Sequence, residues 1–395
     1  MALNFPRNIK HYILASLARK KSVLMLGPRQ AGKTTLLRQV EFDKSINLIV
    51  PSVRRQFEQD PDRLIREIAA FARGKKNPPL VAIDEIQLVP ELINVAQYLI
   101  DESKAQFVLT GSSARRLKAQ ADVNLLPGRV VYMRLDPLNL LEHKPKLIEH
   151  ELYFGSLPGI VTLKSDQDRD TDLVSYVETY LEEEIRKETK IRNLAAFSRF
   201  LSRAALDAGN IVNFSSQANE SGVSSVTIQS YYQVLEDCMI CERIEPFTES
   251  QTRKKLTRSP KFLFFDLGVR RIAAEEGHRL GRVREGQLFE QAIGLSIIRV
   301  LRSHMQRFEL FFWNDPSGPE VDYIIKVKDK LYPIEIKYTE NPSVQDIKHL
   351  KTFLREYKSA PKGFLISLAQ ESQEFGANII GIHWSKLPEI LFSII

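Results

Sequence analysis

The segment Gly27–Thr34, with the sequence GPRQAGKT, is the feature that most constrains the fold of this chain. It fits the pattern G-x-x-x-x-G-K-[ST], with the apolar run Ser22–Leu26 before it as a strand and Thr35–Val40 after it as the start of a helix. Glycines in such a turn let backbone N–H groups approach phosphate oxygens. The segment therefore predicts a loop that binds nucleotide phosphates.

The residues of this loop have distinct expected roles. Lys33 is expected to neutralise the β and γ phosphates and to act in catalysis, and Thr34 to offer its hydroxyl to Mg²⁺. The expected ligands are ATP and Mg²⁺. The residues expected to contact the nucleotide are Gly27, Pro28, Arg29, Gln30, Ala31, Gly32, Lys33, Thr34 and Thr35.

A second motif, LVAIDE at Leu80–Glu85, is an apolar strand that ends in two carboxylates. Asp84 is expected to hold Mg²⁺, directly or through water, and Glu85 to polarise the attacking water. A protein that only sensed nucleotide would not need Glu85. The pair therefore predicts ATP hydrolysis as well as ATP binding.

A third strand, Phe107–Thr110, leads into small polar residues where a sensor of the γ-phosphate would lie. Ser112 is the preferred sensor, with Ser113 as the alternative. An arginine that follows could stabilise transition-state charge, either in the same chain or from a neighbouring subunit of a homo-oligomer. The candidates are Arg115, Arg116 and Arg129, with Arg129 counted among the catalytic residues and a solvated surface arginine as the alternative for each.

Length and charge limit the remaining possibilities. The 395 residues predict two or three domains, and we expect three. A net charge of +7 modestly favours a polyanionic partner such as DNA. The apolar runs are too short to cross a membrane, and Met1–Ile13 lacks a secretory signal, so we expect a cytoplasmic protein. The only cysteines, Cys238 and Cys241, are expected to be reduced core thiols rather than a redox or zinc pair.

The order of strand-like and helical runs predicts an α/β fold. Residues 1–165 alternate between the two and are expected to form a parallel sheet covered by helices. Residues 166–270 are expected to contain a linking helix at Asp172–Arg192 and then a mainly helical region that ends in a hairpin. Residues 271–395 are expected to form a second α/β domain, with a helix at Phe289–Leu301 and strands after it.

The middle region has the spacing of a helix-turn-helix motif. Asn213 is expected to cap a short helix, Gly222 to make the turn, and Ser225 to cap a longer helix that runs from Val226 to about residue 237. The side chains expected to pack inward are Val226, Tyr231, Val234 and Leu235, and those expected to reach DNA are Thr227, Gln229, Ser230 and Gln233. The basic stretch Arg253–Lys261 falls where a wing would contact phosphates, although a protein contact or a solvated loop would suit it too.

Acidic residues and a lysine recur on the C-terminal strands. Because side chains alternate along a strand, Glu335 and Lys337 are expected to share one face. Asp322, followed by E-x-K on the adjoining strand, resembles the PD-(D/E)XK nuclease site, with Val321 in place of the proline. The resemblance implies that Asp322 and Glu335 bind Mg²⁺, that Lys337 orients water or steadies the transition state, and that Glu290 supplies another metal-binding acid.

The motifs together resemble one family. GPRQAGKTTLL, LVAIDEIQ, LTGSSARRL and LPGRVVYMRLDPLNLLE are similar to the AAA-type ATPase domain of a widespread bacterial and archaeal family whose C-terminal half was long catalogued as a domain of unknown function. The similarity continues through TIQSYYQVLED and EVDYIIKV and covers nearly the whole chain. It implies a P-loop ATPase, a winged-helix-like middle at residues 166–270 and a restriction-endonuclease-like end at 271–395.

Two functional hypotheses follow. The first is an ATP-hydrolysing protein that acts on DNA through the winged helix and a Mg²⁺-dependent nuclease-like domain. The alternative is a non-nucleolytic ATPase switch whose C-terminal half binds a protein partner. A cluster of Asp322, Glu335 and Lys337 in an open groove would favour the first, and a buried cluster the second.

Overall fold

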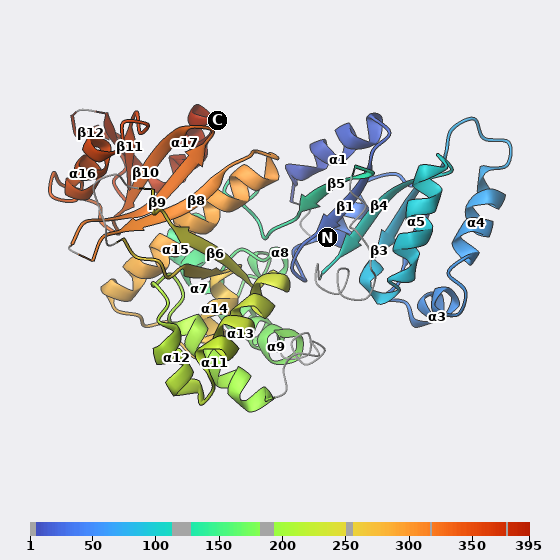
Figure 1. The fold of residues 1–395 in the computed structure, drawn as a ribbon, viewed down its shortest axis with the longest axis horizontal. Helices are drawn as coiled ribbons and strands as arrows, with labels where there is room; N and C mark the ends of the chain where they lie inside the picture. The colour runs from blue at the N-terminus through green and yellow to red at the C-terminus, as the bar shows by residue number, and fades with distance from the viewer. Residues whose placement is uncertain (1–4, 113–127, 182–192, 250–255, 317, 377) are drawn as a thin grey trace.

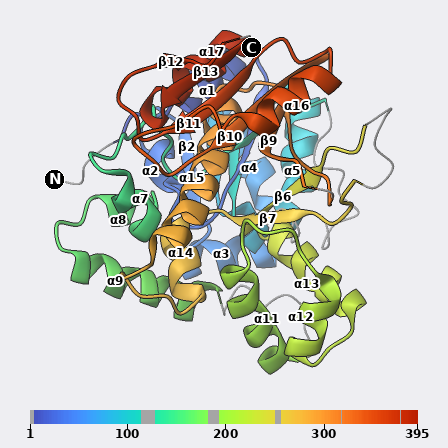
Figure 2. The same cartoon turned by 90° about the vertical axis from the view of Figure 1, so that its left-hand side faces the viewer.

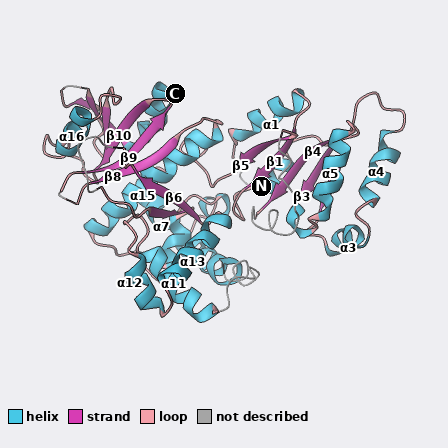
Figure 3. Ribbon diagram, viewed as in Figure 1, coloured by secondary structure: helices cyan, strands magenta, loops and turns pink. Residues whose placement is uncertain are grey.

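The computed structural model of the protein describes residues 5–112, 128–181, 193–249, 256–316, 318–376 and 378–395. Two separate sheets dominate the molecule, one near each end of the long axis, and a group of helices lies beside the second sheet (Figures 1 and 3). Within the described ranges, no helix is both long and apolar enough to cross a membrane.

The first sheet has five strands, all parallel, in the order β2-β3-β4-β1-β5. Its strands are β1 (Ser22–Leu26), β2 (Lys44–Asn47), β3 (Leu80–Asp84), β4 (Gln106–Gly111) and β5 (Val130–Arg134). One apolar core packs α1 (Ile9–Ala18) and α2 (Lys33–Leu37) on one face, and another packs α3 (Pro51–Gln59), α4 (Arg63–Ala72) and α5 (Glu91–Asp101) on the other. Burial on both faces explains why these strands are nearly continuous apolar runs.

The strand order decides where the motifs meet. β4 lies between β1 and β3, so the ends of these three parallel strands lie side by side at one edge. The strand expected at Ile46–Val50 ends earlier, at Asn47, because the Ile49 amide donates to Asn47 Oδ1 and Pro51 begins α3. The predicted parallel sheet is confirmed.

The middle of the chain is mainly helical and has its own apolar core. Its elements are α7 (Ile148–Phe154), α8 (Pro158–Val161), α9 (Asp166–Ser175), η2 (Tyr176–Leu181), α11 (Leu194–Leu206), α12 (Phe214–Ser221), α13 (Ser225–Asp237) and α14 (Leu267–Ala273). The linking helix expected at 172–192 is described as far as Leu181, and its remainder lies outside the described residues. Cys238 and Cys241 are buried thiols in this region.

The helix-turn-helix spacing appears in α12 and α13, with Gly222 between them in the left-handed region at φ 70°. One prediction here was wrong by a residue, because the Ser224 side chain, not Ser225, accepts from Thr227 N as the cap. Val226 lies on the face of α13 opposite the buried Leu235 and is 76% exposed, while Ile228 is buried. The predicted outward face is otherwise present, since the side chains of Gln229, Ser230 and Gln233 are exposed.

The second sheet has eight strands in the order β12-β13-β11-β10-β9-β8-β6-β7. The strands are β6 (Cys241–Pro246), β7 (Lys261–Phe264), β8 (Glu309–Asn314), β9 (Glu320–Val327), β10 (Lys330–Ile336), β11 (Gly363–Ser367), β12 (Gln373–Glu374) and β13 (Ile379–His383). Helices α15 (Arg282–Ser303) and α17 (Leu387–Ile394) share a core with one face, along which α15 runs (Figure 2), and α16 (Lys348–Glu356) packs on the other.

The hairpin expected as a wing is part of this second sheet. β6 pairs with β7 and also, in parallel, with β8, and Ile244 and Leu263 enter the core beneath α15. The C-terminal sheet therefore begins inside the region that was expected to be a separate middle domain. The basic residues 253–255 of the predicted wing lie outside the described residues.

A cluster of four charged side chains joins the two sheets. Arg302 of α15 binds Asp136 at 2.9 and 3.0 Å through Nη1 and Glu242 of β6 at 3.0 Å through Nη2. Arg134 of β5 contacts the same two carboxylates. Burial alone would raise the pKa of Glu242, but the charges of Arg134 and Arg302 outweigh burial and lower it. We call this cluster the ionic junction.

The ionic junction can be tested by removing one charge. In Arg302→Ala, the carboxylates of Asp136 and Glu242 lose a partner while they stay 9% and 14% exposed. We therefore expect the free energy of unfolding of the C-terminal sheet to fall by about 3 kcal/mol. Trp313 and Trp384, the only tryptophans, both lie in the C-terminal unit, so the urea midpoint of tryptophan fluorescence measures this change.

Arg307, an exposed residue a few positions after α15, provides the matched control. Arg307→Ala should leave the urea midpoint unchanged. A wild-type midpoint in Arg302→Ala would show that the ionic junction does not stabilise the C-terminal sheet.

Candidate functional site

The predicted phosphate loop lines a cavity of about 590 Å³. The loop side of this cavity is formed by Arg29, Gln30, Gly32, Lys33, Thr34 and Thr35, and the opposite side by Ile49, Arg54, Glu85, Leu88, Pro158 and Gly159. The carbonyl oxygens of Gly27 and Pro28 accept from Lys33 Nζ, and that of Ala31 accepts from Arg7. Six of the nine residues predicted to contact the nucleotide thus line a single cavity, which we call the nucleotide pocket.

Two glycines of the loop are required by its shape. Gly32 has φ 97°, a left-handed conformation that favours glycine. A Cβ atom at Gly27 would lie 2.2 Å from the carbonyl oxygen of Leu135, which follows β5. The motif's glycines therefore bring the loop backbone close to the neighbouring strand and leave the pocket side free for phosphates.

Lys33 lies inside the curve of the loop and is 4% exposed. Its Nζ donates to the carbonyl oxygens of Gly27 at 2.9 Å and Pro28 at 3.0 Å, and it lies 3.8 Å from Glu85 Oε1. The ammonium group is thus held between the loop carbonyls and Glu85. It can meet phosphate oxygens without a change in the backbone of the loop.

Thr34 and Asp84, the residues expected to hold Mg²⁺, contact each other directly. Thr34 Oγ1 donates to Asp84 Oδ2 over 2.7 Å, and Thr110 donates to the other carboxylate oxygen. Among the described residues, no group of three or more His, Cys, Asp and Glu side chains could hold a metal. A hydroxyl and a carboxylate oxygen are ligands that Mg²⁺ accepts together with substrate phosphates and water.

Glu85 is held on the pocket side of β3 by a strained backbone, with φ 60°. Its Oε2 accepts hydrogen bonds from Ser112 Oγ, at 3.0 Å, and from Gln87 Nε2. Gln87 Nε2 also donates to Ser112 Oγ over 2.9 Å. The predicted sensor Ser112 therefore orients the predicted base Glu85. Gln87, which the sequence motifs did not identify, donates to both side chains.

Two more residues of the site were missed by the sequence analysis. Arg7 donates to the carbonyl oxygens of Ala31 and Asp136, both at 2.6 Å, and so braces the loop. Arg54 of α3 lines the nucleotide pocket, with its Nε 3.4 Å from Glu58 Oε1. No local motif marks either arginine, because both reach the loop from distant parts of the chain.

The expectation that Arg129 acts on the nucleotide of its own chain was wrong. Arg129 precedes Val130, which pairs with Ser22 at the start of β1, whereas the phosphate loop follows the end of β1. The length of a five-residue strand, about 16 Å, separates the two edges. Arg129 instead binds Asp101 at 2.5 Å. The other arginine candidates, Arg115 and Arg116, and the alternative sensor Ser113 lie outside the described residues.

The predicted C-terminal carboxylates lie on the paired strands β9 and β10. Asp322 Oδ2 accepts from the amide of Ile336 at 2.7 Å, and Lys337 Nζ donates to Glu335 Oε1 at 2.7 Å. Glu335 is 2% exposed, and its buried Oε2 has no hydrogen-bond partner among the described residues. Burial, together with the charges of Glu335 and Glu290, raises the pKa of Asp322.

Among the described residues, Glu290 does not complete a group of three acidic side chains that could hold a metal. Lys261 Nζ donates to Glu290 Oε1 at 2.9 Å, which ties α15 to the edge strand β7. This contact also removes Lys261 from the basic stretch that was expected to bind phosphate. The cluster is therefore mostly buried and balanced by two lysines, with side-chain exposures of 12% for Lys261 and 36% for Lys337.

Family models match three consecutive parts of the chain. A model described as AAA domain matches residues 19–144, a domain of unknown function (DUF8612) matches 145–278, and another domain of unknown function (DUF4143) matches 285–387. The first match contains the phosphate loop and both carboxylates of the nucleotide pocket. The AAA and DUF4143 matches support a P-loop ATPase family of the AAA type.

Relatives of similar length occur in bacteria and archaea. The uncharacterized protein Rv2008c of Mycobacterium tuberculosis is 28% identical over 341 residues, which cover 83% of this chain and 73% of that protein. The uncharacterized protein MJ1637 of Methanocaldococcus jannaschii is 21% identical over 422 residues, which cover 93% of this chain and 84% of that protein.

Solved structures are similar only at a low level. The Pif1 helicase from Candida albicans aligns with 45% of this chain and 48% of its own at 14% identity and a TM-score of 0.27. Protein VC1899 from Vibrio cholerae aligns with 94% of this chain and 97% of its own at 12% identity and a TM-score of 0.21. TM-scores this low establish no common fold.

The close approach at Gly27 gives a test of the pocket. In Gly27→Ala, the new Cβ must displace the loop from Leu135, so we expect the affinity for a fluorescent ATP analogue to fall by more than about tenfold, or about 1.4 kcal/mol. Fluorescence titration measures this affinity. Gly281→Ala is the control, since a Cβ there meets no described atom within 4 Å. Equal affinities in the two variants would contradict the assignment of the loop.

Proposed function

We propose that this protein binds ATP in the nucleotide pocket and hydrolyses it there. One observation carries the proposal: a single cavity brings together a buried lysine, a threonine–aspartate pair and a second carboxylate. These groups are Lys33, Thr34 with Asp84, and Glu85. The AAA domain match over the same residues supports it.

The chemistry follows from the position of each group. Lys33 and the amides of the loop stabilise negative charge on the β and γ phosphates. Mg²⁺, held by Thr34 and Asp84, would neutralise phosphate charge when bound. Glu85, oriented by Ser112 and Gln87, accepts the proton of the attacking water as a general base.

The base of the nucleotide has a suitable place beside the phosphates. A smaller cavity of about 200 Å³ shares Gly32, Thr35, Pro158 and Gly159 with the nucleotide pocket. Its remaining walls are largely apolar, and are formed by Phe5, Arg7, Leu36, Gln39, Leu138 and Thr162. We propose that adenine packs in this cavity, because apolar walls suit a flat base.

Replacing the lysine and the general base separates binding from hydrolysis. Lys33→Ala removes charge stabilisation, and we expect phosphate release to fall by about 100-fold or more. Glu85→Gln keeps the shape of the side chain but not the base, so we expect ATP affinity to be kept while kcat falls by about 100-fold or more. Phosphate-release kinetics and equilibrium binding measure the two effects, and normal turnover in either variant would contradict the proposal.

Arg54 is proposed as the arginine that meets the γ-phosphate within the same chain, in place of Arg129. We expect Arg54→Ala to lower kcat by about 100-fold at saturating ATP. The neighbouring Arg55 is exposed and outside the nucleotide pocket, so Arg55→Ala should keep the wild-type kcat. Equal kcat values for both variants would remove Arg54 from the mechanism.

A second candidate function concerns the C-terminal half. Glu335 Oε2, buried without a partner among the described residues, and Asp322 on the adjacent strand suit one Mg²⁺ that would polarise a phosphodiester. DNA would be the substrate, held by the outward face of α13. The burial of the cluster and its lysine contacts favour the alternative, a non-nucleolytic switch whose C-terminal half binds a protein partner.

Plasmid nicking decides between these candidates. For a nuclease, Asp322→Asn and Lys337→Ala should abolish nicking of supercoiled DNA with Mg²⁺ while ATP hydrolysis continues, and Lys358→Ala, at an exposed lysine, should have no effect. If the wild-type protein cuts no DNA with Mg²⁺ or Mn²⁺, cleavage is rejected. The switch would then show an ATPase rate that responds to a protein partner and not to DNA.

A further inference from the structure

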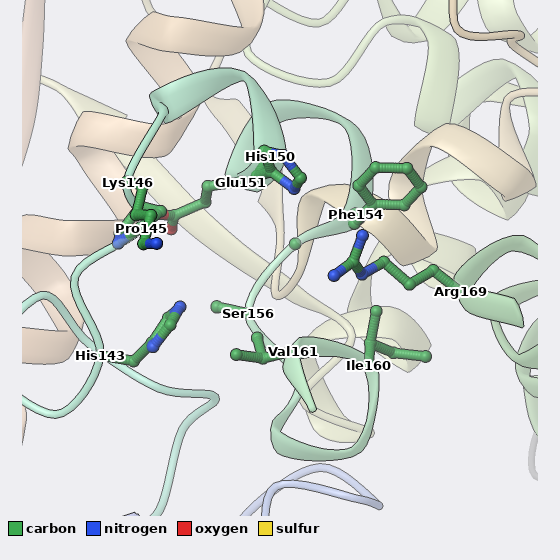
Figure 4. Close-up of a pocket in the computed structure, with 11 residues that line it drawn as sticks. His143, Pro145, Lys146, His150, Glu151, Phe154, Ser156, Ile160, Val161 and Arg169 are labelled. Carbon is green, nitrogen blue, oxygen red and sulfur yellow. The ribbon is translucent and has the colours of Figure 1, made fainter. Parts of the chain in front are cut away.

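A separate cavity of about 250 Å³ lies beside the nucleotide pocket, among helices α7, α8 and α9 (Figure 4). We call it the α7–α9 cavity. Its walls are mainly apolar, with Phe154 from α7 and Ile160 and Val161 from α8. A cavity of this size and lining suits the apolar body of a small organic molecule.

Basic groups surround this apolar centre. Lys146 and Arg169 supply permanent positive charge, and the imidazole rings of His143 and His150 also line the cavity. His143 and Arg169 lie on opposite sides in Figure 4. Arg169 is oriented by Asp166 and by the carbonyl of Leu163, and its guanidinium lies 5.2 Å from the centre of the Phe154 ring. The charge of the cavity therefore favours an anionic ligand.

Glu151, the one acidic side chain among the described residues that line the cavity, does not oppose this. Glu151 is 6% exposed, and its Oε1 lies 3.5 Å from Arg299 Nη1. Burial raises the pKa of Glu151 to about 7, although the charge of Arg299 acts in the opposite direction. Near neutral pH the group is therefore partly uncharged, and in that form its hydroxyl can donate to an anion.

The α7–α9 cavity shares a wall with the nucleotide pocket. Pro158 and Gly159, at the start of α8, line the nucleotide pocket, while Ile160 and Val161, at its end, line the α7–α9 cavity. Ser156, which precedes α8, is fixed because its Oγ accepts from Arg299 Nη1 at 2.6 Å. A ligand that moves α8 therefore acts on both cavities.

We propose that the α7–α9 cavity binds a small organic anion, a carboxylate or phosphate ester with an apolar body, and that this ligand changes the affinity of the nucleotide pocket for ATP. The effect is reciprocal, since ATP must change the affinity for the anion by the same factor. The coupling rests on the proposed binding of ATP, whereas the anion site does not.

Two fluorinated probes test the anion site on the full chain. In ¹⁹F NMR titrations, 4-fluorobenzoate and 4-fluorophenyl phosphate should bind saturably with Kd near about 1 mM. Uncharged 4-fluorobenzamide should bind at least about tenfold more weakly, and the tighter of the two anions identifies the acid group of the ligand. Equal binding of the amide and both anions would overturn the site.

Charge variants locate the probe. Lys146→Gln and Arg169→Gln should each weaken binding of the tighter probe by at least about fivefold. The controls are Lys76→Gln and Arg73→Gln, at exposed residues that follow α4, and these should bind like the wild type. Because Lys146 is exposed, its replacement tests the site even if Arg169→Gln perturbs folding. Wild-type affinity in Lys146→Gln and in a folded Arg169→Gln would overturn the site.

Titration of a fluorescent ATP analogue tests the coupling. At saturating probe, the Kd for the analogue should change by at least about threefold, and saturating ATP should change the probe's Kd by the same factor. An unchanged Kd would overturn the coupling. If the wild-type chain binds no ATP while the probe still binds, the proposed function and the coupling fail but the anion site stands.

Discussion

Asp136 is one of the residues through which the two halves of the molecule meet. Its carbonyl oxygen accepts from Arg7, which also holds Ala31 of the phosphate loop, and its carboxylate accepts from Arg302 of α15. The loop and the C-terminal sheet are thus bound to the same residue from opposite sides. Removing one charge from such a buried set leaves the others unpaired, which costs far more than a surface ion pair contributes. The junction therefore fixes the position of the second sheet relative to the nucleotide pocket.

The same contacts would give a nucleotide in the proposed site a physical route to the rest of the chain. Arg7 donates to Ala31 of the phosphate loop and to Asp136 of the ionic junction. Arg299 donates to the carbonyl of Leu138 and to the hydroxyl of Ser156, and Ser156 lines the α7–α9 cavity. A shift of the phosphate loop would therefore displace residues of α15 and α8 without a large hinge motion between the two sheets. Coupling of this kind requires an element with two arrangements, and α8, whose residues line both cavities, is the candidate.

The sequence was sufficient to predict the parts of the fold and site that depend on local pattern. The phosphate loop, Asp84 and Glu85 follow apolar strands, so their common edge of the sheet could be predicted. Contacts between residues that lie far apart in the sequence could not be predicted in this way. Arg7 donates to a carbonyl oxygen 129 residues away in the sequence. Because β6 pairs with β8, the hairpin that was predicted as a wing belongs to the C-terminal sheet. The α13 helix shows a similar limit, since Val226, which was expected to pack inward, lies on the outward face of the helix.

The most direct test of the account is the steady-state release of phosphate from ATP by the purified full chain. We expect many phosphates to be released per chain, with a requirement for Mg²⁺, because Thr34 and Asp84 have only one carboxylate and one hydroxyl to offer the ion. Release at the spontaneous rate, both with Mg²⁺ and with EDTA, would contradict the central claim that the nucleotide pocket hydrolyses ATP.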